Sequence, residues 1–375
     1  RAMTDSLLVG LMSGTSMDGI DAALVRINNQ RIELIDCLES PLPAQLREEI
    51  STLSHPGENE IERMGRLDRK LGLLFAQSCL DLLRQSGIDR RQIRAIGSHG
   101  QTVRHHPPSA SHGGEPCFTL QIGDPNTIAE ITGITTVADF RRRDIAAGGE
   151  GAPLVPAFHQ QVFAAADISR AIVNIGGIAN ISLLSGADTL GFDSGPGNTL
   201  LDHWIASQRG QSYDAGGSWG AEGEVDQSLL QQLLTHPYFD QPLPKSTGKE
   251  VFNPDWLEQQ LSTLPPLEPR DVQATLAEFT AASIALGLDR CGEIDEVYVC
   301  GGGAANADLM RRLFRHVAPA KLGSTAELGC DPAWVEAAAF AWLAQQRLES
   351  LPGNLATATG AAGPRILGAI YPGAE

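Results

Sequence analysis

The first 140 residues alternate between apolar runs and glycine-containing turns. Three short apolar or alternating runs come first, joined by turns too short for a crossover helix, so they predict an antiparallel meander. These runs lie at residues 6–12, 21–27 and 31–40. The pattern then predicts an amphipathic helix at 61–85, strands at 93–100 and 118–122, a short helix at 126–133 and a strand at 134–140.

The same order of elements restarts after about Phe140. Strand, glycine turn and strand fill 169–186, a third strand with a polar end follows at 189–198, and a helix covers 198–208. Much later, the buried strand near 294–300 runs into glycines, as the strand at 93–100 does. The chain therefore predicts an α/β fold of two βββαβα copies, divided into 1–139 and 140–375, with a tail at 352–375 able to pack back on the first copy. Chance similarity of glycine turns is the alternative.

One turn in the first meander is unusually long and polar. It lies within "GLMSGTSMDGID", residues 10–21. Backbone amides and hydroxyls in such a turn can cradle phosphate oxygens, and Asp18 and Asp21 would then approach a bound Mg²⁺. A plain hairpin is the alternative, although hairpin loops are usually shorter. The Gly-Lys-Ser/Thr ending of a Walker P-loop is absent.

Three further glycine clusters follow strands of the second half. They are "NIGGIAN" at 174–180, "FDSGPGN" at 192–198 and "CGGGAAN" at 300–306. Each alone is more often a tight turn than a ligand site. Four such turns spread over two similar halves indicate a nucleotide held in a cleft between domains.

Composition narrows the possible partners. The formal net charge is -17, from 28 Lys+Arg and 45 Asp+Glu, which argues against nucleic acid or an anionic membrane. The six cysteines form no Cys-x-x-Cys pair, which favours reduced thiols in a cytosol. No run of about 20 apolar residues predicts a membrane span. The low-complexity segment 105–116 is expected to be a surface loop with solvated histidines.

Longer motifs carry a family resemblance. They include "IGSHGQTV", "QIGDPNTIAEITGI", "VADFRRRDIAAGGEGAPLVPAFH", "PKSTGKE" and "LPGNLATATGAAGPRILG", besides the four glycine segments, and they run nearly end to end. The chain resembles the anhydro-N-acetylmuramic acid kinases, within the broad superfamily of acetate and sugar kinases, heat-shock 70 chaperones and actin. The loop at 105–116 is a local departure.

The resemblance implies two ribonuclease-H-like domains hinged over ATP, in a cytoplasmic bacterial enzyme that forms a homodimer. The implied reaction converts 1,6-anhydro-N-acetylmuramic acid to N-acetylmuramic acid 6-phosphate during cell-wall recycling. Because the anhydro bridge occupies the 6-oxygen, water must add at the anomeric carbon while the released 6-oxygen takes the phosphoryl group. That reaction needs a general base, as in an inverting glycosidase, together with ATP and Mg²⁺.

Two carboxylates are the catalytic candidates. Asp193, at the polar end of a strand, is the expected base, and capping of the helix that starts near Asn198 is its structural alternative. Glu336 stands alone in the apolar segment "AWVEAAAFAWLA", where it either faces solvent or lines the cleft.

Arginine and histidine are candidates for the sugar. Arg141, in the basic run at 141–143, is expected to bind the lactyl carboxylate, although such runs are often solvated turns. His99 ends a buried strand and either contacts the sugar or is structural. Lys245 stays outside the predicted site. The substrate residues are Ser13, Thr15, His99, Arg141 and Asp193. The nucleotide residues are Gly14, Thr15, Ser16, Met17, Asp18, Gly19, Ile20, Asp21, Gly176, Gly177, Gly195, Gly197, Gly301, Gly302 and Gly303.

Two other functions remain open at this point. An ATPase module of the same superfamily would act through protein contacts, and an ordinary sugar kinase would phosphorylate a free hydroxyl. Phosphate release without a sugar would favour the ATPase, whereas strict dependence on an anhydrosugar would favour the ring-opening kinase.

Overall fold

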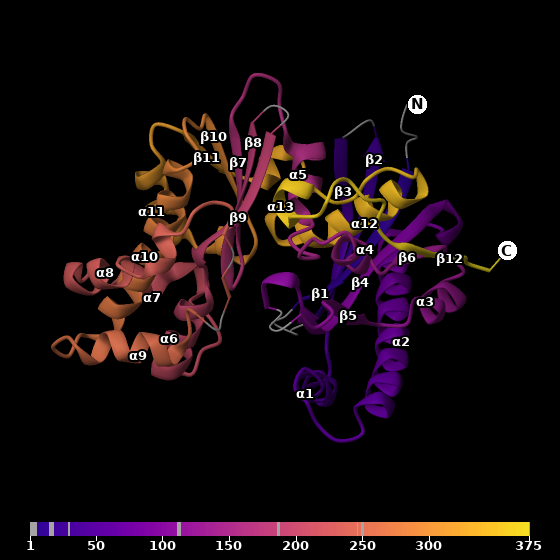
Figure 1. The fold of residues 1–375 in the computed structure, drawn as a ribbon, viewed down its shortest axis with the longest axis horizontal. Coiled ribbons are helices and arrows are strands. Elements are labelled where there is room, and N and C mark those ends of the chain that lie inside the picture. Colours follow the sequence, from indigo (N-terminus) through magenta and orange to yellow (C-terminus); the bar gives the residue numbers. More distant parts are fainter. Residues whose placement is uncertain are drawn as a thin grey trace. The chain divides into compact units, whose positions relative to one another are not determined.

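The computed structural model describes residues 6–14, 19–28, 31–110, 114–185, 188–245, 247–248 and 251–374. The chain divides into two compact units (Figure 1). Unit 1 comprises Arg1–Val162 and Trp334–Glu375, and unit 2 comprises Phe163–Ala333. This division differs from the predicted one, because 140–162 and 334–375 belong to unit 1.

Unit 1 contains a seven-stranded sheet in the order β12-β6-β4-β1-β2-β3, with β5 beside β4. The strands β1, β2 and β3 form the antiparallel meander expected from the sequence, whereas β4 and β6 continue the sheet in parallel to β1. The strands are β1 (Ser6–Ser13), β2 (Gly19–Asn28), β3 (Arg31–Pro41), β4 (Ile93–His106), β5 (Phe118–Ile122), β6 (Thr136–Ala138) and β12 (Ala369–Tyr371). β4 is longer than predicted and continues into the segment expected to be a loop.

The sheet of unit 1 packs against helices. The helices are α1 (Ala44–Leu53), α2 (Glu60–Ser86), α3 (Pro125–Thr132), α4 (Arg142–Ala146), α5 (Val155–Phe163), α12 (Val335–Leu348) and α13 (Ala356–Thr359). The apolar face of α2, with Leu71 and Phe75, packs on β1 and β2, and the helix ends at Gly87 in the left-handed region. The alanine-rich α12 packs on β1 and β4.

Two glycines let α12 approach the sheet closely. Gly10 of β1 and Gly97 of β4 are direct neighbours in the parallel ladder. A Cβ on Gly10 would lie 1.7 Å from the carbonyl oxygen of Ala337, and a Cβ on Gly97 would lie 1.9 Å from that of Phe340. Any larger side chain at either position would push the helix away.

Unit 2 repeats the connectivity of unit 1. Its five strands run in the order β11-β10-β7-β8-β9, in which β7, β8 and β9 form the antiparallel meander and β10 and β11 extend it in parallel. The strands are β7 (Arg170–Ile175), β8 (Ile178–Ser185), β9 (Asp188–Pro196), β10 (Glu296–Cys300) and β11 (Lys321–Ser324). The order matches β6-β4-β1-β2-β3, which confirms the predicted α/β fold of two similar halves.

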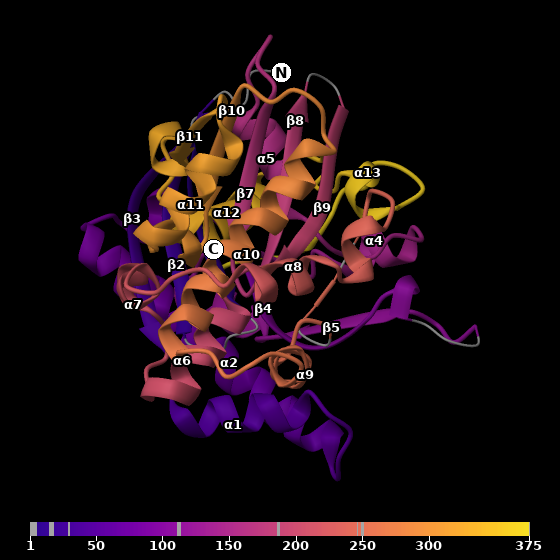
Figure 2. The same ribbon diagram turned by 90° about the vertical axis from the view of Figure 1, so that its left-hand side faces the viewer.

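Helices α10 and α11 lie across the sheet of unit 2 (Figure 2). The helices of this unit are α6 (Thr199–Arg209), α7 (Ser218–Ala221), α8 (Gln227–Leu234), α9 (Pro254–Ser262), α10 (Pro269–Asp289) and α11 (Ala307–Val317). Short 3-10 helices of the chain lie at Arg90–Gln92, Pro108–Ala110, Ala215–Gly217, Pro237–Asp240, Gly302–Ala305, Thr325–Leu328 and Pro332–Trp334. A second apolar cluster between α6, α8, α9 and α10 supports this helical layer.

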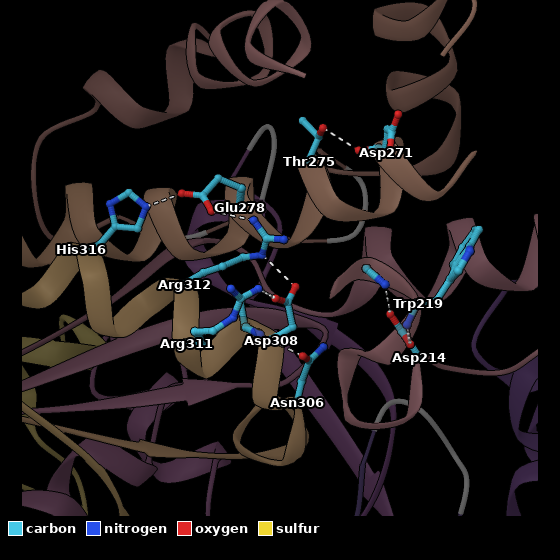
Figure 3. Close-up of polar contacts among 12 residues, drawn as sticks. Asp214, Trp219, Asp271, Thr275, Glu278, Asn306, Asp308, Arg311, Arg312 and His316 are labelled. Carbon is cyan, nitrogen blue, oxygen red and sulfur yellow. Dashed lines mark hydrogen bonds and ion pairs between the residues drawn. The ribbon is translucent and has the colours of Figure 1, made fainter. Parts of the chain in front are cut away.

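A polar network joins α10 to α11 (Figure 3). The buried guanidinium of Arg312 donates to Asp308 at 2.8 Å and to Glu278 at 2.9 Å, and the ring of His316 lies 2.6 Å from the same glutamate. Asn306 caps α11 by accepting from the amide of Leu309. The glycine turn 301–303 continues through a short 3-10 helix into α11, so the network anchors the helix that follows this turn. Within the described part of the chain, no helix combines the length and apolarity needed to cross a bilayer.

The glycine contact with α12 gives a stability prediction. We expect Gly97→Ala to lower the free energy of unfolding by at least the roughly 1–3 kcal/mol typical of overpacking, because the new methyl group meets main-chain atoms. Urea unfolding of the two proteins measures the change. The exposed helical Gly65 has open space around its Cβ, so Gly65→Ala should leave stability equal or higher. Equal stability of Gly97→Ala and wild type would contradict the close approach.

Candidate active site

In unit 1, a histidine and an arginine from distant segments form a pair. Nε of Arg141 donates to Nε2 of His99 at 3.0 Å, and Nη1 donates to the carbonyl oxygen of Gly151 at 2.9 Å. The ring of His99 packs against Phe340 of α12, with centroids 4.7 Å apart. Among the described residues, Nη2 of Arg141 has no hydrogen-bond partner. Arg141 is therefore not a solvated turn residue, in contrast to the exposed Arg142 and Arg143.

The hydrogen bonds of the pair define the protonation state of both residues. Nδ1 of His99 lies 2.9 Å from the carbonyl oxygen of Gly100, so the neutral ring donates there and accepts from Arg141. Burial, reinforced by the charge of Arg141, holds the pKa of His99 well below its usual value. Burial also lowers the pKa of Arg141 to about 10, and the charges of Glu336 and Asp144 oppose this. The pair therefore carries a single positive charge at neutral pH.

A buried aspartate holds the loop that carries Arg141. Asp144 is fully buried and accepts hydrogen bonds from the amide of Gly151 at 2.8 Å, from the side-chain amide of Asn354 at 2.7 Å and from the hydroxyl of Thr359 at 2.8 Å. Sequence reasoning missed this residue, although it directly follows the basic run. The contacts with 354–359 come from the far end of the chain, which no local pattern reveals.

Glu336 lies in the first turn of α12. Its side chain reaches solvent, while the surrounding protein raises its pKa and the positive charge of Arg141 opposes that rise. The structure therefore brings Glu336, Arg141 and His99 into one electrostatic group of unit 1.

The described part of the polar turn lies at the end of β1 and the start of β2. The hydroxyl of Ser13 donates to Gln101 at 2.7 Å, and the amide of Gln101 donates to the carbonyl oxygen of Gly14 at 3.3 Å. Asp21 is half-buried in β2 beside Gly19. The predicted contacts of Thr15, Ser16, Met17 and Asp18 lie outside the described residues.

The side chain of Ile20 lies in the core. It is 1% exposed and packs between β2 and α2, because the alternation of the strand turns it inward. The predicted nucleotide contact of residue 20 therefore concerns its main chain.

Two glycine turns of unit 2 lie against each other. The amide of Gly197 donates to the carbonyl oxygen of Gly177 at 2.9 Å, and the amide of Asn198 donates to that of Gly176 at 2.8 Å. A Cβ on Gly197 would lie 2.3 Å from the Gly176 oxygen, so this contact requires glycine. Gly195 has φ 151° and packs against Phe239.

The third glycine turn adjoins the first. Gly301 has φ 79°, and a Cβ there would lie 2.4 Å from Oδ1 of Asn174. A Cβ on Gly303 would meet the side chain of Ile175 at 2.4 Å, whereas a Cβ on Gly302 would find only Nδ2 of Asn198, at 3.8 Å. Turns that are far apart in sequence thus meet at the ends of β7, β9 and β10.

Asp193 lies in β9 and is held by the segment 238–247. Its Oδ2 accepts from the amide of Thr247 at 3.0 Å, its own amide donates to the carbonyl oxygen of Lys245 at 2.9 Å, and its carbonyl oxygen accepts from the hydroxyl of Tyr238 at 2.6 Å. The helix-capping alternative is wrong, because Asn198 is the N-cap of α6.

Lys245 has a structural role in unit 2. Its ammonium group is buried, donates to the carbonyl oxygens of Tyr238 at 3.0 Å and Phe239 at 3.2 Å, and lies over the Tyr238 ring. Burial lowers its pKa to about 8, with Arg290 acting in the same direction.

Comparison with known proteins identifies the family. The family model described as anhydro-N-acetylmuramic acid kinase matches residues 6–373. The chain belongs to this family. Curated relatives named anhydro-N-acetylmuramic acid kinase include one from Shewanella amazonensis, 54% identical over 374 residues, and one from Shewanella loihica, 53% identical over 373 residues. Each alignment covers 99% of this chain and 100% of the relative. A solved activator of 2-hydroxyisocaproyl-CoA dehydratase from Clostridium difficile aligns with 92% of this chain and 96% of its own, at 13% identity and a TM-score of 0.46.

The anhydro-N-acetylmuramic acid kinase match spans both units, so the candidate site residues of each unit lie within the matched residues. The predicted site residues are divided between the units. His99, Arg141 and Glu336 belong to unit 1, and Asp193 with the three glycine turns belongs to unit 2. Within the described residues, no group of three or more His, Cys, Asp or Glu side chains is close enough to hold a metal ion.

The buried histidine of this kinase-family protein gives a pH prediction. The unfolded chain protonates His99 near pH 6.5, whereas the folded protein does not until far lower pH, so stability falls as pH drops below that value. Between pH 7.5 and 5.5 the loss from one such group is about 1.4 kcal/mol. We expect His99→Gln to remove that part of the pH dependence, as measured by urea unfolding at both pH values. His159, whose pKa burial lowers to about 3, contributes equally to both proteins.

The control for this measurement is His55→Gln, because His55 is exposed. This variant should keep the pH dependence of the wild-type protein. An unchanged dependence in His99→Gln would show that the pKa of His99 is the same in the folded protein as in the unfolded chain, which would contradict the prediction.

Proposed function

We propose that the protein is an ATP-dependent kinase that opens the 1,6-anhydro ring of 1,6-anhydro-N-acetylmuramic acid. Water adds to the anomeric carbon, the bond from that carbon to the bridging oxygen breaks, and the released 6-oxygen takes the γ-phosphoryl group. The products are N-acetylmuramic acid 6-phosphate and ADP. The observation that carries the proposal is the family match over residues 6–373.

Asp193 is the proposed general base. The attacking water must lose a proton, and a carboxylate held in one orientation serves this step. Oδ2 of Asp193 accepts from the Thr247 amide, and the main-chain amide and carbonyl oxygen of Asp193 bond to Lys245 and Tyr238. These three bonds hold Asp193 in place, so little reorganisation is needed at the moment of reaction. Glu336, whose pKa is raised, is the second proposed catalytic carboxylate.

The glycine turns are the proposed nucleotide site. The open space at Gly302 and Gly176 would allow phosphate oxygens to approach main-chain amides, and the turn at 13–21 would add donors from unit 1. Mg²⁺, when bound, neutralises charge that develops on the phosphates. The carboxylate oxygens of Asp21 and Asp18 are the kind of ligand that Mg²⁺ prefers, and one or two carboxylates suffice beside phosphate oxygens.

The Arg141 guanidinium is the proposed partner of the lactyl carboxylate. Its Nη2 group faces no acceptor among the described residues, while Nε and Nη1 are already oriented by His99 and Gly151. A preoriented guanidinium loses little side-chain entropy when it binds an anion. A cytoplasmic homodimer is part of the same proposal, and sedimentation equilibrium tests the dimer.

The reaction itself is tested with labelled water. We expect ADP release only when the anhydrosugar is added, and oxygen-18 from water at the anomeric carbon of product examined before exchange. Asp193→Asn should lower turnover by about 100- to 10,000-fold while ATP and sugar still bind, because the amide lacks a basic oxygen. The exposed Asp240→Asn is the control and should retain activity.

Three results would contradict the proposal. ADP release without sugar would favour the ATPase alternative, early label at the 6-oxygen would reject ring opening by water at the anomeric carbon, and near-normal turnover of Asp193→Asn would reject the base.

The nucleotide site is tested with two glycines of one turn. Gly302→Val should fold normally, since its side chain enters open space, and should raise the KM for ATP about tenfold or more. Gly303→Ala should instead lower stability, because its methyl group meets Ile175. ATP titration and urea unfolding distinguish the two effects. An unchanged KM in Gly302→Val would exclude this turn from the site.

The arginine is tested by comparison with its neighbour. Arg141→Ala should weaken use of the anhydrosugar about 10- to 100-fold with a smaller effect on ATP, because hydrogen bonds to charged groups are worth about 1.5–3 kcal/mol. The exposed Arg143→Ala should change neither. Equal losses for both ligands in Arg141→Ala would indicate a structural role alone.

A further inference from the structure

Unit 1 contains a cavity of about 210 Å³, whose lining includes His99 together with residues that have no role in the proposed reaction. Its wall is formed by α2, the middle of β4, the end of β5, the start of α3, the end of β6 with the residues after it, and Tyr371 of β12. Figure 1 shows α2, α3, β6 and β12 beside one another in this unit. The lining comes from six segments, so the fold builds the cavity.

The cavity adjoins the arginine–histidine pair, because His99 is among its lining residues. Side chains alternate along β4, and Gly97 and the His99 ring face α12. Ser98 therefore faces α2, whose residues Met64, Gly65 and Asp68 line the cavity. The ring of His99 and the hydroxyl of Ser98 thus point to opposite faces of the strand, although both residues line the cavity.

Three polar groups around the cavity lack partners. The hydroxyl of Ser98 is buried, in a residue 1% exposed, and has no hydrogen-bond partner among the described residues. Asp68 accepts from the amide of Gly123 at 2.7 Å through Oδ1, and within the described chain neither its Oδ2 nor the Tyr371 hydroxyl has a partner. A buried polar group without a partner is costly, so a ligand that bonds to the Ser98 hydroxyl would gain free energy, whereas bonds to the half-buried Asp68 and Tyr371 would replace bonds to water.

An ion pair forms the rim. Nε of Arg142 donates to Asp139 at 2.7 Å, and Asp139 has a left-handed backbone with φ 61°. Non-glycine residues adopt this conformation rarely, and such residues gather at ligand sites. Asp68 and Asp139 together outweigh the charge of Arg142, so the cavity disfavours an anion.

The volume and lining of the cavity define the size and shape of a ligand that fits it. At about 30 Å³ per water, the volume equals roughly seven waters, or a ligand of about a dozen non-hydrogen atoms. Met64, Leu120, Ile122 and Pro125 add an apolar wall. An acceptor carboxylate, two hydroxyls that can donate or accept, and an apolar wall match a ring with hydroxyls at its edge and C–H groups on its face.

We propose that this cavity of unit 1, lined by Ser98, Asp68 and Tyr371, binds a neutral, hydroxyl-rich molecule of monosaccharide size, separately from the anionic anhydrosugar. Because Ser98 precedes His99 and Arg142 follows Arg141, occupancy of the cavity contacts both segments that carry the pair. The site stands whether or not the kinase reaction is as proposed.

The test uses the full chain and two matched probes. D-glucose is neutral, and D-glucuronate has nearly the same shape with a carboxylate. Saturation-transfer NMR should show glucose bound with a Kd of about 1–10 mM, as expected for a ligand of this size, and glucuronate at least about tenfold weaker. Saturating anhydrosugar should not displace glucose.

Variants locate the probe. Gly65→Leu fills the cavity from α2, where the space at its Cβ is open and leucine favours the helix, so it should fold and weaken glucose binding at least about tenfold. Ser98→Ala and Asp68→Asn should weaken it as well. The exposed Gln77→Leu on the same helix and Asp193→Asn in unit 2 should bind glucose like wild type.

The proposal is overturned by any of four results. They are no glucose binding at about 50 mM, equal binding of glucuronate, unchanged binding in Gly65→Leu, and displacement of glucose by the anhydrosugar. Loss of turnover in Asp193→Asn tests the kinase reaction alone, so the two proposals fail separately.

Discussion

The contact between α12 and the glycines of β1 and β4 determines the candidate site of unit 1. Gly10 and Gly97 allow main chain to meet main chain, which no other residue type permits at these distances. The close approach determines how near to the sheet Phe340 lies, and His99 packs against Phe340. It also positions Glu336, which lies in the first turn of the same helix. The arginine–histidine pair thus depends on two residues that have no side chains.

Much of the fold was predictable because it is local or repeated. The meander, α2 with its terminal Gly87, and the glycine turns all leave signals within a few residues, and the common strand order of the two units follows from repeating them. The length of β4 was not predicted, because pairing with β5 overrides its polar, histidine-rich sequence. The helices α8 and α9 depend on an apolar cluster contributed by five helical segments, which local patterns do not reveal.

The residues of the candidate site were more predictable from the sequence than the hydrogen bonds between them. The positions of Asp193, Arg141 and His99 came from motifs, but the bond between Arg141 and His99 joins segments 42 residues apart. Asp144 was not predicted, because two of its partners lie 210 and 215 residues away. Sequence periodicity does not encode such long-range pairing.

The way in which Asp193 is held has an evolutionary consequence. Among its contacts with the described residues of 238–247, Asp193 bonds to main-chain groups of Lys245 and Thr247 and to the side chain of Tyr238. The path of this segment orients the carboxylate, and the buried ammonium group of Lys245 supports that path through the carbonyl oxygens of Tyr238 and Phe239. A change of backbone path there would therefore move the carboxylate even if Asp193 itself were retained.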